Sequence, residues 1–175
     1  SELCAAPRAA SPDRERVALV GTIPLNVHLP NSDLDLVCQI PSGCSVPEFL
    51  QRLASRFGDR PGYTSWLRSP SSADSTASGI ARFELSLSAG TSVPVEIFAA
   101  QQPVAEQMAY RHFVIEERLL READANGSNK GDAASAAVRR LKAAGQSTEG
   151  AFCEAFGIPV PDDSDAFRVL YKLNR

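Results

Sequence analysis

The chain has 175 residues, a length that fits one domain of ordinary size and excludes two large independent domains. Hydrophobic residues make up 43% and charged residues 22%, which is typical of globular chains and excludes a disordered or fibrous protein. With 18 basic and 21 acidic residues the net charge is −3, so the chain lacks the basic excess that nucleic-acid binding requires, and nucleic acid is not expected as a partner.

Residues 1–16 are rich in Ala, Pro and Arg and show no hydrophobic period, which predicts an N-terminal arm or a short helix. The segment carries acidic residues and prolines where a signal peptide has a basic start and an apolar stretch. No run of about 18 apolar residues, the length needed to span a bilayer, occurs in the chain. We therefore expect a cytoplasmic protein with no membrane partner.

The region 17–101 is predicted to form an α/β core. Short apolar runs at 17–20 and 34–40 each end in turn residues, which indicates two adjacent central strands. Ser45 and Glu48 have the spacing of a capping box, which predicts a helix that ends at Gly58. Further strands are predicted at 63–67, 80–87 and 93–99, with a Ser-rich loop at 69–79.

The region 102–175 is predicted to be a helical part packed on this core. Apolar residues follow a helical period over 103–121, and a polar loop covers 124–132. Later helices are predicted at 133–144, 148–156 and 165–173, two of them ending before a glycine. The whole pattern predicts an α+β fold, with a mixed sheet, packed helices and a helical C-terminal part.

An acidic pair, Asp33 and Asp35, opens the second predicted strand. In a strand these two side chains project from one face, while Leu34 and Leu36 project from the other face into the core. Two carboxylates on one face repel each other unless a cation lies between them, and Mg²⁺ prefers such oxygen ligands. The same spacing is common on solvated strand edges, so the pair alone does not decide between a metal site and a surface.

Gly21 and Thr22 directly follow the first predicted strand. A glycine there lets backbone N–H groups approach a phosphate without a Cβ atom in the way, and threonine adds a hydroxyl group. A Gly-Thr pair after a strand is by itself an ordinary turn. Its place before the acidic pair favours a phosphate site.

The run 20–24 together with 32–38 resembles the nucleotidyltransferase superfamily, whose pattern is a strand, Gly with a small hydroxyl residue, then an apolar-flanked Asp-x-Asp. The string looks more narrowly like an uncharacterised bacterial branch, the domain of unknown function family 4269. The resemblance covers roughly residues 17–173. Its other matching segments are 95–98, 109–112, 118–120, 141–142, 145, 148–149 and 151–152.

This resemblance implies a nucleotidyltransferase-like mixed β-sheet and a Mg²⁺ (or Mn²⁺) cofactor. By the same resemblance Asp33 and Asp35 are expected to be catalytic and to hold the metal. Gly21, Thr22 and Ser32 are expected to bind the nucleotide phosphates. Two residues of the connecting loop depart from the sequences that this chain resembles, because position 26 is more often glycine than Asn and His28 is unusual.

A third carboxylate is expected on another strand, and two residues are candidates. Glu84 fits a solvated strand edge, whereas Glu96 is bracketed by Val95 and Ile97 and stands where the resemblance places the third catalytic and metal-binding acid. We therefore assign Glu96. The alternative is a Glu on the exposed face of a half-buried sheet.

His112 lies on the apolar stripe of the helix predicted at 103–121. Such a histidine is more often a hydrogen-bonded core residue, but Arg111 and His112 are possible substrate contacts if the helix packs beside Glu96. The cluster of Arg139, Arg140 and Lys142 is either a solvated face or a phosphate contact.

The expected function is a Mg-dependent nucleotidyltransferase that transfers a nucleoside monophosphate from an NTP to an unknown hydroxyl-bearing acceptor. Metal charge would supply most of the catalysis by neutralising developing negative charge. The alternative is a catalytically inactive nucleotide-binding or partner-binding module with the same fold.

Overall fold

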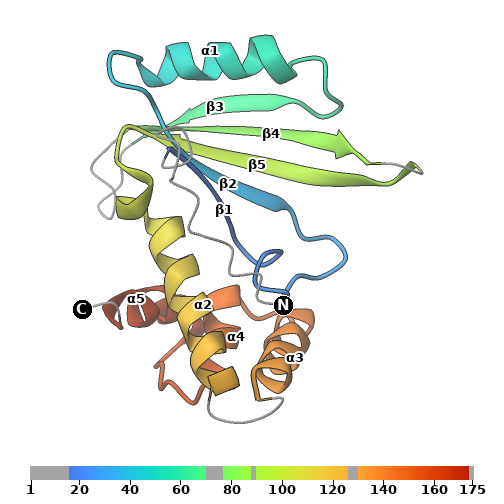
Figure 1. Cartoon of the computed structure of the whole chain (residues 1–175), viewed down its shortest axis with the longest axis vertical. Helices are drawn as coiled ribbons and strands as arrows, with labels where there is room; N and C mark the ends of the chain where they lie inside the picture. Colours follow the sequence, from blue (N-terminus) through green and yellow to red (C-terminus); the bar gives the residue numbers. More distant parts are fainter. Residues whose placement is uncertain (1–15, 70–76, 88–89, 126–129, 174–175) are drawn as a thin grey trace, which may run out of the picture.

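The computed structural model describes residues 16–69, 77–87, 90–125 and 130–173 (Figure 1). The elements in chain order are β1 (Val17–Val20), β2 (Leu34–Gln39), α1 (Val46–Phe57), β3 (Thr64–Arg68), β4 (Ser78–Ser86), β5 (Ser92–Ala100), the 3-10 turn η3 (Val104–Glu106), α2 (Met108–Ala125), α3 (Lys130–Ala143), α4 (Thr148–Ala155) and α5 (Asp163–Lys172). The predicted α+β class is confirmed, with a mixed sheet, packed helices and a helical C-terminal part. Residues 1–15 of the predicted N-terminal arm lie outside the described residues.

The five strands form one sheet in the order β1-β2-β5-β4-β3. β2 and β5 are parallel, and the other three neighbouring pairs are antiparallel. β1 and β2 are adjacent, as predicted, but β1 is an edge strand rather than a central one. The reason is the crossover through α1, β3 and β4, which inserts β5 beside β2 and places β2 inside the sheet.

One face of the sheet packs against α1 (Figure 1). The predicted capping box is confirmed, since the Glu48 carboxylate accepts a hydrogen bond from Ser45 N at 2.7 Å and Ser45 Oγ accepts one from Glu48 N. Leu50 of α1 packs so closely on β4 that a Cβ atom at Gly79 would lie 2.9 Å from its Cδ2. The leucines that flank Asp35 point into this apolar layer, which leaves Asp35 on the other face of the sheet.

The other face packs against η3 and the start of α2, through Val20, Val37 and Val104. A single helix from residue 103 was predicted, but the 3-10 turn η3 and an extended Gln107 precede α2. The buried Gln107 amide nitrogen donates to the backbone oxygens of Cys38 and Gln102, each at 3.0 Å. These two hydrogen bonds fix the break and attach the start of α2 to the end of β2.

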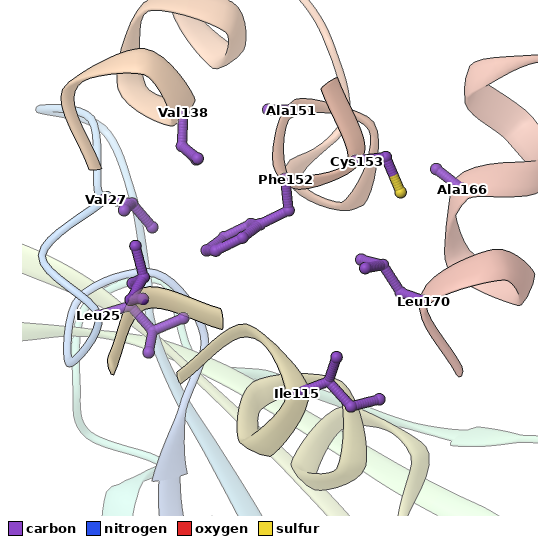
Figure 2. Packing of buried hydrophobic residues seen from close by; sticks show 10 residues of the cluster. Leu25, Val27, Ile115, Val138, Ala151, Phe152, Cys153, Ala166 and Leu170 are labelled. Atoms are coloured by element: carbon purple, nitrogen blue, oxygen red, sulfur yellow. The ribbon is translucent and has the colours of Figure 1, made fainter. Parts of the chain in front are cut away.

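A separate apolar cluster joins the helices to the loop between β1 and β2 (Figure 2). Leu25 and Val27 of that loop are buried against Phe152 of α4, and Ile115 of α2 belongs to the same cluster. Burying each such side chain contributes about 1.5–3 kcal/mol. The loop that carries Gly21, Thr22 and Ser32 is therefore held by the helical part and not only by the strands.

Candidate functional site

Asp35 and Glu96 are neighbours on parallel strands. Their Cα atoms are paired in the β2–β5 register, so both side chains point from the same face of the sheet. Asp33 lies just before the first residue of β2, at the same end of the strand. The parallel pairing of β2 with β5 thus places Glu96 beside the acidic pair.

Gly21 lies against the carboxylate of Asp35. Its φ is +77°, and a Cβ atom there would come within 2.1 Å of Asp35 Oδ2. Any other residue would be strained in this backbone conformation and would also displace the carboxylate. Glycine is expected at this position because it lets a phosphate approach the backbone. In the structure, Asp35 occupies the space where a side chain of residue 21 would lie.

The loop between β1 and β2 is closed by its own hydrogen bonds. Ser32 Oγ accepts from Leu29 N at 2.9 Å and lies 3.4 Å from Thr22 Oγ1. Val27 N donates to Thr22 O at 3.0 Å. The hydroxyl groups of Thr22 and Ser32, ten residues apart in sequence, are therefore side by side.

Two side chains of the basic cluster on α3 bind this loop. Arg139 donates to Asn26 O, and Lys142 Nζ donates to Val27 O at 3.2 Å. Asn26 has a φ of +57°, a conformation that asparagine and glycine tolerate best, which explains why glycine suits position 26. Arg140 is exposed, so the three basic residues do not act as one cluster.

Asp35 is under strong negative potential. Burial, and then the charges of Asp33 and Glu96, raise its pKa to about 7, although Lys142 and Arg82 act in the opposite direction. Half of such carboxyl groups would be protonated at neutral pH. A cation bound beside Asp35 would remove the cause of this repulsion.

Glu96 forms an ion pair with Arg82 of β4, its neighbour in the β4–β5 register. The Arg82 guanidinium lies 5.3 Å from the ring centroid of Trp66, which is 39% exposed on β3. The other candidate acid, Glu84, lies two residues further along β4 and does not line the cavity. Glu96 is thus the acid of the two that faces Asp35.

A cavity of about 470 Å³ lies between the sheet and the helices. Its sheet wall includes Gly21, Thr22, Asp35 and Glu96, together with Arg68, whose guanidinium lies 5.9 Å from the Phe98 ring centroid. Of the other predicted site residues, Asp33, Ser32 and Arg111 do not line the cavity, whereas His112 does.

The cavity also has a helical wall, which we define as His112 and Glu116 of α2, Glu149 of α4 and Phe167 of α5. His112 is 4% exposed and stacks on Phe167, with ring centroids 3.9 Å apart. Burial lowers the pKa of His112 to about 4, so its imidazole is neutral at pH 7, and Glu149 Oε1 lies 3.9 Å from its Nδ1. His112 is therefore both a packed core residue and a cavity residue.

Glu116 is the residue of this wall that no sequence pattern singles out. It is 4% exposed, and burial followed by the charge of Glu149 raises its pKa to about 8. In the sequence it is one of several charged residues of an amphipathic helix, followed by Glu117 and Arg118. Only the packing of α2 against α3 and α5 distinguishes it from its exposed neighbours.

The acids of the sheet wall have the ligand chemistry that a hard divalent cation requires. Asp35 and Glu96 offer oxygen atoms from adjacent positions, and the charge of Asp33 acts on the same point. Within the described parts of the chain, no three His, Cys, Asp or Glu side chains are already arranged as a metal site. Each helix of those parts is too short or too polar to cross a lipid bilayer.

Comparison with known proteins gives a family and a distant structural likeness. No curated protein matches the chain. A chain in the solved structure of the polymerase core of TRAMP, an RNA surveillance complex, is similar with 15% identity and a TM-score of 0.45; the match covers 88% of this chain and 49% of that one, so this chain spans about half its length. The family model described as a domain of unknown function (DUF4269) matches residues 14–173, and the chain therefore belongs to that family.

Proposed function

We propose that the protein is a metal-dependent nucleotidyltransferase that transfers a nucleoside monophosphate from an NTP to a hydroxyl-bearing acceptor. The observation that carries this proposal is the placement of Asp35 and Glu96 side by side on parallel strands, against the Gly21 backbone and in one cavity. Phosphoryl chemistry of this kind needs clustered carboxylates and a backbone that can approach phosphate closely.

In this reaction the acceptor oxygen bonds to the α-phosphorus of the NTP while the bond to pyrophosphate breaks. Gly21 and Thr22 would contact the β- and γ-phosphates, and Ser32 would hold Thr22 in place through the hydroxyl contact between them. Arg68 and Arg82, which were not selected from the sequence, add positive charge beside the sheet wall. Pyrophosphate is the leaving group.

Asp33, Asp35 and Glu96 would hold Mg²⁺ or Mn²⁺. When bound, the metal would neutralise charge that develops on the triphosphate and lower the pKa of the acceptor hydroxyl. After burial, the charges of Asp33 and Glu96 raise the pKa of Asp35, and a bound cation would offset this repulsion, which supports the assignment.

Glu96 would also orient the acceptor hydroxyl and take up its proton. The ion pair with Arg82 holds the Glu96 carboxylate in place on the sheet. His112 would contact the substrate from the helical wall. Arg111, which does not line the cavity, would contact only a substrate that extends beyond the cavity.

The first test is thermal unfolding with Mn²⁺ and a non-hydrolysable NTP analogue, together and separately. We expect the melting temperature to rise most with both, because a ligand at about 100 times its Kd stabilises by about 2.7 kcal/mol. Asp35→Asn should lose this rise. Glu84→Gln is the matched control, since Glu84 lies on the neighbouring strand away from the cavity.

Turnover is tested by pyrophosphate release from each NTP in the presence of cell extract. Glu96→Gln should still bind the nucleotide with metal but release pyrophosphate slowly. A metal- and nucleotide-dependent rise that persists in Asp35→Asn would contradict the proposal. Binding by the parent protein without any release would instead favour the inactive nucleotide-binding module.

A further inference from the structure

The helical wall presents ionisable groups that the proposed metal and phosphate contacts do not need. Glu116 and Glu149 come from α2 and α4, more than thirty residues apart in sequence, and both line the cavity. Neither belongs to the acidic pair or its neighbouring strand. Glu116 and Glu149 are therefore available to a ligand other than the NTP and metal of the sheet wall.

Glu116 is the strongest sign of a ligand at this wall. Its side chain is 4% exposed and lines the cavity, and no other residue in the described ranges donates a hydrogen bond to its carboxyl group or forms an ion pair with it. Its carboxyl oxygens are not among the fully buried unsatisfied side-chain atoms of the described residues, so they reach the cavity, where a ligand can meet them. The partner must donate hydrogen bonds or positive charge.

The carboxyl groups around the cavity favour a cation as that partner, since a bound cation would also favour the ionised form of Glu116, whose pKa is otherwise raised to about 8. Asp35, Glu96, Glu116 and Glu149 line it with four carboxyl groups, whereas Arg68 is the one lining Lys or Arg side chain among the described residues. Lys142, whose positive charge acts on Glu116, donates to Val27 O and does not line the cavity. Lys142 therefore offsets only part of the acidic charge of the helical wall, and it does so from outside the cavity.

The rest of the wall suits an organic cation better than a metal ion. Phe167 is 40% exposed and stacks on the neutral His112 ring, with an interplanar angle of 21°. An aromatic face attracts an alkylammonium group but offers a hard metal ion no oxygen ligand. Two carboxyl groups beside stacked rings thus match an amine.

We infer that the helical wall binds the ammonium group of the acceptor, so that the acceptor is an amine that also carries a hydroxyl group. This inference rests on the proposed function, whose acceptor class it names. The ammonium group does not react. It anchors the molecule at Glu116 and Glu149, while the hydroxyl oxygen reaches the α-phosphorus at the sheet wall and loses its proton to Glu96.

The probes are ethanolamine and ethylene glycol, which have the same size and share a hydroxyl group but differ in the ammonium. Binding of each is followed by NMR titration of the isotope-labelled protein at matched ionic strength. The parent should bind ethanolamine about tenfold more tightly, the effect of one charge-assisted contact. In Glu116→Gln this preference should fall to about twofold or less.

Glu117→Gln is the matched control, because Glu117 is the next residue of the same helix and pairs with Arg121. It should keep the parent's preference. Glu149→Gln removes the charge of the other carboxyl group of the same wall and should also reduce the preference for ethanolamine. The inference would be overturned if the parent bound the two probes equally or bound neither of them. It would also be overturned if Glu116→Gln kept the parent's preference.

Asp35→Asn separates this inference from the proposed function. It should lose the stabilisation by Mn²⁺ with nucleotide but keep the preference for ethanolamine, because Asp35 lies on the sheet wall. If the parent binds no nucleotide but still prefers ethanolamine, the proposed transferase function alone is contradicted. If the parent binds nucleotide with metal but does not prefer ethanolamine, the acceptor assignment alone is contradicted.

Discussion

Replacing Glu116 by glutamine should stabilise the protein at neutral and alkaline pH. The carboxyl group ionises near 4.5 in an unfolded chain, whereas burial and the charge of Glu149 raise its folded-state pKa to about 8. Between these values the folded protein holds a proton that the unfolded chain has released. The free energy of unfolding therefore falls as the pH rises from about 4.5 to about 8, and this loss is absent below pH 4.5.

The magnitude follows from the size of the shift. A pKa difference of one unit corresponds to about 1.4 kcal/mol, so raising the pKa from 4.5 to about 8 destabilises the ionised protein by about 5 kcal/mol. At pH 7, where folded Glu116 is still mostly protonated, the loss is about 3 kcal/mol. Glutamine has nearly the same shape and no charge, so Glu116→Gln should recover this amount without leaving a cavity.

Urea unfolding of the parent, Glu116→Gln and Glu117→Gln at pH 5, 7 and 9 measures the effect. With a urea m-value of about 1–3 kcal/mol per molar, the midpoint of Glu116→Gln should rise by about 1 M or more at pH 7 and further at pH 9. Glu117→Gln should change the stability by less than about 1 kcal/mol. A difference between parent and Glu116→Gln that is the same at all three pH values would refute the assignment of the loss to this carboxyl group.

Gly21→Ala should destabilise the protein by at least about 1–2 kcal/mol because of the positive φ alone, as measured by urea unfolding. It should also displace Asp35 and abolish nucleotide binding, as measured by the Mn²⁺-nucleotide thermal shift. Asn26→Gly should leave the melting temperature nearly unchanged, whereas Asn26→Val should cost about 1–2 kcal/mol, since a β-branched residue does not tolerate a φ of +57°. Burial lowers the pKa of His112 from 6.5 to about 4, so the parent should lose stability as the pH falls through this range. His112→Phe keeps an aromatic ring against Phe167 and should not show this loss. Urea midpoints at pH 7 and pH 4.5 measure the difference.

Local sequence signals predicted the elements of this fold well where short-range chemistry determines them. β1 has the predicted limits, and the capping box at Ser45 and Glu48 starts α1 as its spacing indicates. The errors lie where distant groups decide. β1 is an edge strand because β5 returns beside β2, and the predicted helix from 103 is interrupted because Gln107 hydrogen-bonds to Cys38, 69 residues away.

The sheet wall was largely accessible from sequence because its residues follow a pattern tied to strand geometry. Alternation along β2 predicted which face carries Asp35, and the same alternation on β5 favoured Glu96. The ion pair of Glu96 with Arg82 was not predicted, since it depends on the register of β4 against β5. A register is set by loop lengths and packing together, and a period alone does not give it.

The helical wall was not accessible in this way, because its acidic groups come from different helices and no local pattern relates them. Lys142 shows how closely the two walls are nevertheless connected. Burial lowers its pKa, while charges on both sides of the cavity oppose that shift, namely those of Glu116, Asp33, Asp35 and Glu149. Since Lys142 also holds the loop through Val27 O, one cation both balances the acids of the two walls and fixes the backbone that leads into Asp33. The electrostatics of the acidic pair thus depend partly on a helix that begins almost a hundred residues later. For this reason the spacing of the pair in the sequence could locate the site but could not predict the ionisation of its carboxyl groups.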